Sequence, residues 1–370
     1  MAILILRQLG AIIGCLGILC PRVAAAQTKT VPDATACPTC KISVEEIVRL
    51  DARGELPTAP LSVVRDGHGR FWLTFANELA MVYDPTGRFV MSLRRGEGPG
   101  EFQYPWSVVP LGDSLLVQDR GRGVTVLGPD LKAVRSLRGA LAQGQIIPIG
   151  WPDSVLLNGR RHDLADGVNP FHVASYAGQQ VRILRSFGAD KGVITDPRSP
   201  PSLTRRIAAA GPNAFWASKA SKYALQEWST AGILMQTLVR TPAWFPDAIS
   251  MMNFDAPPPP EIQALQQDAK GLVWVFVSVA APSWRDGYPS SRPPAPVRRG
   301  MPEAGPGAFQ YEKLYRTTVE VLDPVAGRVV ARRTLDNWIV GTMGDGLAAI
   351  YDTTKDGEPF VHIVRLMLVR

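Results

Sequence analysis

The chain has 370 residues, with 40 Lys and Arg against 33 Asp and Glu, and a formal net charge of +7 at pH 7. This net charge is small for the length of the chain, so it gives no indication of a nucleic-acid partner. No apolar run reaches the roughly 20 residues that a helix needs to span a bilayer, so the sequence predicts no transmembrane segment.

Residues 1–26 are typical of an export signal. Arg7 precedes an apolar run from Leu9 to Leu19, and small residues follow up to Ala26, as a signal peptidase requires. We therefore expect a mature chain that begins at Gln27 and is periplasmic or extracellular.

A lipid anchor is the alternative at this end of the chain. The run Ile12-Ile13-Gly14-Cys15 resembles a lipobox, which would make Cys15 a lipidated N-terminus. Cleavage there would leave the apolar stretch Leu16 to Leu19 in the tether. Cleavage after Ala26 is therefore favoured over lipidation.

The segment 27–41 contains the pair Cys37 and Cys40, spaced as Cys-Pro-Thr-Cys. In an exported protein such a pair forms a local disulfide or stays as two thiols. Haem attachment needs a His after the second Cys, where Lys41 stands, and a zinc site needs two further ligands. We expect a structural role, as a disulfide that pins the N-terminal segment.

A repeated pattern runs through residues 42–370: a tight polar turn, a β-rich run, a second turn and another β-rich run. The first turns are Asp66–Gly69, Gly112–Asp113, Pro152–Asp153, Gly211–Asn213, Asp268–Gly271 and Gly344–Gly346. The second turns are Asp84–Gly87, Gly128–Asp130, Ala177–Gly178, Ser229–Gly232, Asp323–Gly327 and Lys355–Gly357.

Gly, Asp and Pro supply the backbone angles of these turns, and β-branched and aromatic residues fill the runs between them. Each unit is predicted to be a four-stranded antiparallel sheet, so the fold class is all-β, a six-bladed β-propeller. The strand Ile42 to Leu50 has no partner in its own unit. We expect it to pair with the last blade and close the ring.

The stretch Arg95 to Pro105, RGEGPGEFQYP, resembles the NHL-type repeat of six-bladed propellers, in which a Gly-rich crossover with a Phe and a Pro links two blades. The chain is similar in particular to exported bacterial six-bladed propellers of mostly unknown function, which often begin with a Cys-x-x-Cys segment. The resemblance implies that Phe102 and Pro105 wedge between adjacent sheets.

A second copy of the motif, GPGAFQY at 305–311, follows a Pro-rich insertion over about 282–310. It lies between the second and third strands of blade five, whereas the first copy, 98–104, follows the fourth strand of blade one. Both connections emerge on the same side of a propeller, so we expect the two copies on one face, in blades roughly opposite each other. The other long connections should share that face.

Loops on a rigid scaffold are where binding groups gather. We therefore expect a non-catalytic binding or scaffold module whose loop-rich face contacts a protein, peptide or glycan in the cell envelope, because Tyr, Trp and Arg are enriched at interface anchors. The candidate residues are Arg95, Glu97, Tyr104, Trp106, Arg160, Arg161, Trp244, Trp284, Arg285, Tyr288 and Tyr311. A purely structural role in the envelope is a further possibility.

Arginine doublets recur along the chain and allow two interpretations. They can hold anionic glycans or phosphates on one surface, or lie on solvated strand edges. The doublets are Arg94-Arg95, Arg160-Arg161, Arg205-Arg206, Arg298-Arg299 and Arg332-Arg333. We favour the solvated edges.

The enzymatic alternative is a metal-dependent lactonase or hydrolase. No cofactor is predicted from the residues themselves, but propellers of the gluconolactonase and senescence-marker group hold a divalent ion at the central pore with Glu, Asn and Asp ligands. Glu97 is similar to the Glu of that group's GEGP motif, and its Asn and Asp partners cannot be matched. His162, Asp163 and Asp166 are the other compact cluster, with oxygen donors suited to calcium, although two carboxylates in a polar loop are more often turn residues. Calcium or zinc is the divalent cofactor that the enzymatic alternative would use.

Overall fold

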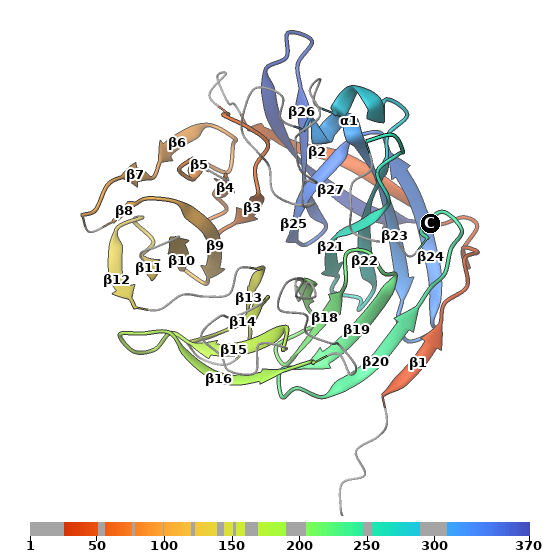
Figure 1. Ribbon diagram of the computed structural model, residues 1–370, viewed down its shortest axis with the longest axis horizontal. Coiled ribbons are helices and arrows are strands. Elements are labelled where there is room, and N and C mark those ends of the chain that lie inside the picture. The colour runs from red at the N-terminus through yellow and green to blue at the C-terminus, as the bar shows by residue number, and fades with distance from the viewer. Residues whose placement is uncertain are drawn as a thin grey trace, which may run out of the picture.

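The computed structural model describes residues 26–50, 56–75, 78–98, 100–119, 123–138, 144–150, 153–159, 169–189, 205–246, 254–288 and 309–370. Six sheets form a six-bladed β-propeller, as the sequence predicts (Figure 1). The expected signal sequence lies outside the described residues, apart from Ala26. Among the described residues, no helix is long and apolar enough to cross a membrane.

Blades one to three have four strands each, given from the innermost strand outward. Blade one contains β3 (Ser62–Arg65), β4 (Phe71–Thr74), β5 (Met81–Tyr83) and β6 (Phe89–Ser92). Blade two contains β9 (Pro105–Leu111), β10 (Ser114–Asp119), β11 (Gly123–Leu127) and β12 (Ala133–Leu137). Blade three contains β13 (Ile146–Pro148), β14 (Ser154–Asn158), β15 (Phe171–Ser175) and β16 (Arg182–Phe187).

Blades four and six each include a strand from the N-terminal end of the described chain, whereas blade five does not. Blade four contains β17 (Arg206–Ala209), β18 (Ala214–Ser218), β19 (Ala224–Ser229), β20 (Leu234–Val239) and a fifth strand, β1 (Gln27–Thr30). Blade five contains β21 (Glu261–Gln267), β22 (Val273–Ala280), β23 (Tyr315–Asp323) and β24 (Arg328–Leu335). Blade six contains β25 (Trp338–Gly344), β26 (Leu347–Thr353), β27 (Pro359–Val369) and β2 (Lys41–Leu50).

The ring closes through strand β2, as predicted. It pairs antiparallel with β27 from Lys41 opposite Val369 to Leu50 opposite Val361. The inner strands follow one another around the centre, and β25 of blade six meets β3 of blade one. In blades one to five the second polar turn of the repeat joins the third and fourth strands. In blade six β2 supplies the fourth strand, so the second turn, at 355–357, joins the second and third strands.

Polar turns are held by aspartates that the repeat pattern places at fixed positions. Asp66 accepts hydrogen bonds from the backbone N of His68 and Arg70 and from Trp72 Nε1. Asp268 binds Trp274 Nε1 in the same way, at 3.0 Å. Such Asx turns fix where one strand ends and the next begins. The register between the third and fourth strands of blades one to five also shifts once, which twists the outer edge strands and disfavours edge-to-edge pairing.

Hydrophobic clusters lie between neighbouring blades and form the core. Phe102, from the first motif copy, is 1% exposed and packs with Trp72, Leu93 and Val108 between blades one and two. Burying a phenylalanine contributes about 1.5–3 kcal/mol. Pro105 is also buried, at the start of β9. The expected wedge between two sheets is therefore confirmed for Phe102.

The second motif copy places its phenylalanine in a core as well. Phe309 is 9% exposed and belongs to the cluster shared by blades one and six. The blades that carry the two copies, one and five, each adjoin blade six, so the expectation that they lie opposite each other is wrong. Phe309, at the end of the insertion, therefore packs onto the neighbouring blade.

Residues 26–40 form a strap around the outside of blades four to six. Strand β1 pairs parallel with β20, from Gln27 opposite Gln236 to Thr30 opposite Val239. Thr35 bridges Val329 of β24, and the strap then enters β2. Cys37 and Cys40 form a disulfide within it. The three blades that share the strap are thereby held together at their outer edges (Figure 1).

Candidate functional site

The two faces of the ring differ in the length of their connections. On one face every connection between strands is a short turn, and the longest covers residues 176–181. The other, which we name the loop face, carries the crossovers 93–104, 188–205 and 240–260 and the connections 159–170 and 281–314. Both motif copies belong to the loop face, as predicted. The face with elaborated loops is the candidate for binding.

The first motif copy folds around one of its own carboxylates. Glu101 Oε2 accepts a hydrogen bond from the backbone N of Gly98 at 2.7 Å, and a Cβ at Gly96 would lie 2.1 Å from the same oxygen. Asp119, which is 4% exposed, accepts from the backbone N of Gln103 and Tyr104 at 2.7 and 2.8 Å. The glycines therefore make room for Glu101, and this crossover is a structural joint.

Three predicted residues of this joint reach the surface. Arg95 lies 3.7 Å from the carboxylate of Glu78, and its guanidinium lies 5.8 Å from the ring centre of Tyr104. The Tyr104 side chain is 42% exposed. Glu97 accepts a hydrogen bond from Gln103 Nε2 at 3.3 Å and is exposed. Arg95 and Tyr104 thus form a small exposed cation–π pair on the loop face.

An aromatic layer fastens the blade-five insertion to blade six. Tyr311 stacks on Trp338 with ring centres 5.2 Å apart, and Tyr288 lies 6.0 Å from Phe309 and 5.6 Å from Trp284. Trp284 is only 6% exposed, so it supports the layer from within. These contacts, with those of Phe254, define what we name the aromatic seat: Phe254, Trp284, Tyr288, Phe309, Tyr311 and Trp338.

Arg285 is the exposed predicted residue at the aromatic seat. Its guanidinium lies 4.3 Å from the ring centre of Trp284. Next to Tyr311 in the chain, burial and the charge of Asp352 raise the pKa of Glu312, and burial with Glu312 and Asp352 raises the pKa of Tyr351 to about 12. A carboxyl group with a raised pKa therefore adjoins the seat in the chain.

The remaining predicted residues fall elsewhere. Trp244 packs edge-to-face on Tyr223 at 6.2 Å, under the guanidinium of Arg332, and so belongs to the interface of blades four and five. Trp106 lies on β9, and its side chain is not described. Two further binding candidates, Arg160 and Arg161, lie outside the described residues. So do the three residues of the candidate metal cluster, His162, Asp163 and Asp166.

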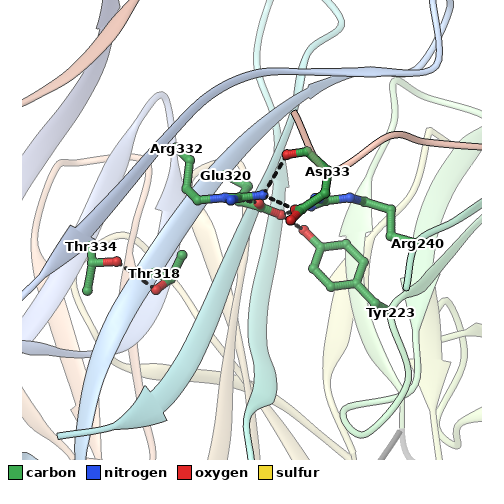
Figure 2. A network of polar contacts seen from close by, with 7 residues as sticks. All are labelled: Asp33, Tyr223, Arg240, Thr318, Glu320, Arg332 and Thr334. Atoms are coloured by element: carbon green, nitrogen blue, oxygen red, sulfur yellow. Dashed lines mark hydrogen bonds and ion pairs between the residues drawn. The ribbon is translucent and has the colours of Figure 1, made fainter. Parts of the chain in front are cut away.

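Sequence reasoning missed a polar network at the outer edge of blades four and five (Figure 2). Glu320 of β23 is fully buried, and its carboxylate accepts from Tyr223, Arg240 and Arg332. Asp33 of the strap also pairs with both arginines, at 2.8 Å from Arg240 Nη2. Two guanidinium groups thus face two carboxylates. The sequence signal was a lone Glu in the apolar run TTVEVLD, which identifies a buried acid but not its partners.

The network changes the ionisation of its members. Burial works to raise the pKa of Asp33, but the hydrogen bond and charge of Arg332, together with the charge of Arg240, outweigh it and hold that pKa below its ordinary value. Burial and the adjacent Glu320 carboxylate raise the pKa of Tyr223 well above its ordinary value. All these groups bind one another, so the network is a structural lock that holds the strap.

The six inner strands do not supply the Glu, Asn and Asp ligands that the enzymatic alternative implies. Among the charged residues of the six inner strands, Glu261 is the single carboxylate beside Arg65 and Arg206, and these strands contain no Asn or Asp. Glu97 lies between β7 (Arg94–Arg95) and β8 (Glu101–Phe102), at the periphery of the ring (Figure 1). In the part of the chain that the structure describes, no group of three or more His, Cys, Asp or Glu side chains is placed to hold a metal ion.

Two solved structures have a similar fold. A putative exported protein from Bacteroides fragilis has a TM-score of 0.54 at 12% identity and covers 92% of this chain and 99% of its own. A member of the DUF4221 family from Bacteroides vulgatus has a TM-score of 0.53 at 9% identity, covering 91% and 98%. At these identities the likeness shows the fold alone. Neither a protein-family model nor a curated protein sequence matches the chain.

Proposed function

We propose that this chain is an exported, NHL-like β-propeller that acts as a non-catalytic binding or scaffold module through its loop face. The observation that carries the proposal is the contrast between the two faces: short turns on one, and all the long connections on the other. Export is supported by the signal-like residues 1–26 and by the similar fold of a putative exported protein.

The geometry of the loop face suits recognition better than catalysis. The aromatic seat joins the two described ends of the blade-five insertion, since Tyr288 contacts Phe309 and each ring contacts the next. Exposed groups stand on this base and on the first crossover, namely Arg285, Arg95 and Tyr104. A partner would meet preorganised Arg and Tyr side chains, which lowers the entropic cost of association.

Site-specific photocrosslinking in the producing cell tests the proposal. A photoreactive phenylalanine replaces Tyr104 or Arg285 on the loop face, and matched controls carry it at Lys132 or Lys270, which are exposed on the turn face. We expect discrete crosslinked species from the loop-face positions and none from the controls. Crosslinks from the turn face alone, or the same species from all four positions, would contradict the proposal.

The metal-dependent alternative has its own test. Because the inner strands offer one carboxylate and two arginines, we expect elemental analysis of residues 27–370 to find no stoichiometric calcium or zinc. One tightly held ion per chain, whose chelation lowers the melting temperature, would favour the hydrolase instead.

A further inference from the structure

Arg206 is a half-buried arginine that the fold leaves without an ion-pair partner in the described part of the chain. It begins β17, the inner strand of blade four, at the end that faces the loop face. Its Nε donates to the carbonyl oxygen of Ile262 at 3.1 Å, and its Nη2 donates to Gln263 Oε1 at 3.5 Å. Both acceptors are neutral, and both belong to the inner strand of blade five.

The remaining donors of this guanidinium are open. Nη1 has no protein acceptor in the described residues, and the residue as a whole is partly exposed. Burial lowers the pKa of Arg206, and the charge of Glu261 opposes that effect only from a distance. A cation enclosed by protein without a counter-ion in contact is unfavourable, unless an anion from solution binds it.

The chain around Arg206 carries further basic residues at the loop face. Arg205 precedes it, and Lys219 and Lys222 lie on the connection between β18 and β19. The backbone of that connection adjoins blade five, because the carbonyl of Ala220 accepts a hydrogen bond from the backbone N of Ile262 at 2.8 Å. Positive charge on this side of the ring attracts small anions.

We propose that Arg206 binds a carboxylate at the inner edge of blades four and five, on the loop face. Blade five accepts hydrogen bonds from Nε and from one hydrogen of Nη2. The free edge of the guanidinium is therefore formed by Nη1 and the second hydrogen of Nη2. Two parallel N–H groups on that edge match the two oxygens of a planar carboxylate. The carboxylate belongs to a free small acid or to an acidic sugar. This inference goes beyond the proposed function, since it holds whether or not a macromolecule binds the loop face.

Fluorine NMR with trifluoroacetate as the probe tests the site on the full mature chain, at constant ionic strength. We expect one saturable site in the wild-type chain and at least tenfold weaker binding in Arg206→Gln, since the substitution removes both the positive charge and the pair of parallel N–H donors. Arg182→Gln is the matched control: it removes the same charge from an exposed position on β16 and should leave binding unchanged. Acetate and glucuronate then compete with the probe, and glucuronate should compete better if the site takes acidic sugars.

Two results would overturn the proposal: no saturable change in the wild-type chain, or equal binding by wild type and Arg206→Gln. If Arg206→Gln does not fold, NMR spectra of the wild-type chain with isotope-labelled arginine guanidinium groups test the site instead. The side-chain resonance that is absent from Arg206→Lys must then move on addition of trifluoroacetate. A stationary resonance would equally refute the site.

Discussion

Two arginines stand at opposite edges of blade four and differ in how their charge is balanced. Arg240, just after the outer strand, is 3% exposed and lies among Glu320, Asp33 and Tyr223. Arg206, on the inner strand, has only a carbonyl and an amide oxygen as partners. The charge of Arg240 is balanced by acids within the protein and serves the fold, whereas Arg206 retains binding capacity for a ligand.

The largest effect is expected at the centre of the outer network. Glu320→Gln leaves two guanidinium groups with half of their counter-charge in a buried site, and removing one partner of a buried ion pair costs about 3–5 kcal/mol. Urea unfolding of the purified variant measures this loss. A loss below about 1 kcal/mol in the free energy of unfolding would show that the network contributes little to stability. The contrast between Arg240 and Arg206 would then not hold.

A smaller effect is expected from the strap itself. Asp33→Asn removes a carboxylate whose side chain is 51% exposed, so we expect a loss of roughly 1 kcal/mol in the free energy of unfolding. Hydrogen exchange should also become faster at Val31, whose backbone N donates to Val239 O at 2.9 Å. Unchanged exchange there would mean that Asp33 does not hold the strap.

Acidification should act oppositely on the strap and on the aromatic seat. The pKa of Asp33 is lowered in the folded chain, so its stabilisation is present above the unfolded value of about 3.9 and is lost as the pH falls through the folded pKa. The pKa of Glu312 is raised, so its contribution is full below about 4.3 and is lost as the pH rises through the folded pKa.

Hydrogen exchange at pH 6 and pH 3, corrected for intrinsic rates, measures both regions at once. We expect less protection of residues 26–36 and more protection of residues 309–314 at the lower pH. Parallel changes in the two segments would indicate global rather than local effects of pH.

The fold was predictable because its signals are local. Turns such as Asp66 to Gly69 and Asp268 to Gly271 contain the residues that stop one strand and start the next, and the spacing of such turns defined the blades. The unpaired run at 42–50 correctly indicated the closing strand.

The site was less predictable because it depends on contacts between distant segments. Trp284 was expected to meet a partner but is 6% exposed and packs against Tyr288 within the aromatic seat. The doublet at Arg332 looked like a solvated edge, yet Arg332 binds Glu320 and Asp33, a residue 299 positions away in the chain. Nothing near Arg332 in the sequence indicates either acid.

The most direct test of the central claim is the free energy of unfolding of Arg206→Gln, measured by urea denaturation beside Glu320→Gln. Because Arg206 has no balancing acid in contact, we predict that its neutralisation changes stability by less than about 1 kcal/mol or raises it, while Glu320→Gln lowers stability by several kcal/mol. A loss at Arg206 as large as that at Glu320 would show that both arginines are structural, and would contradict the account.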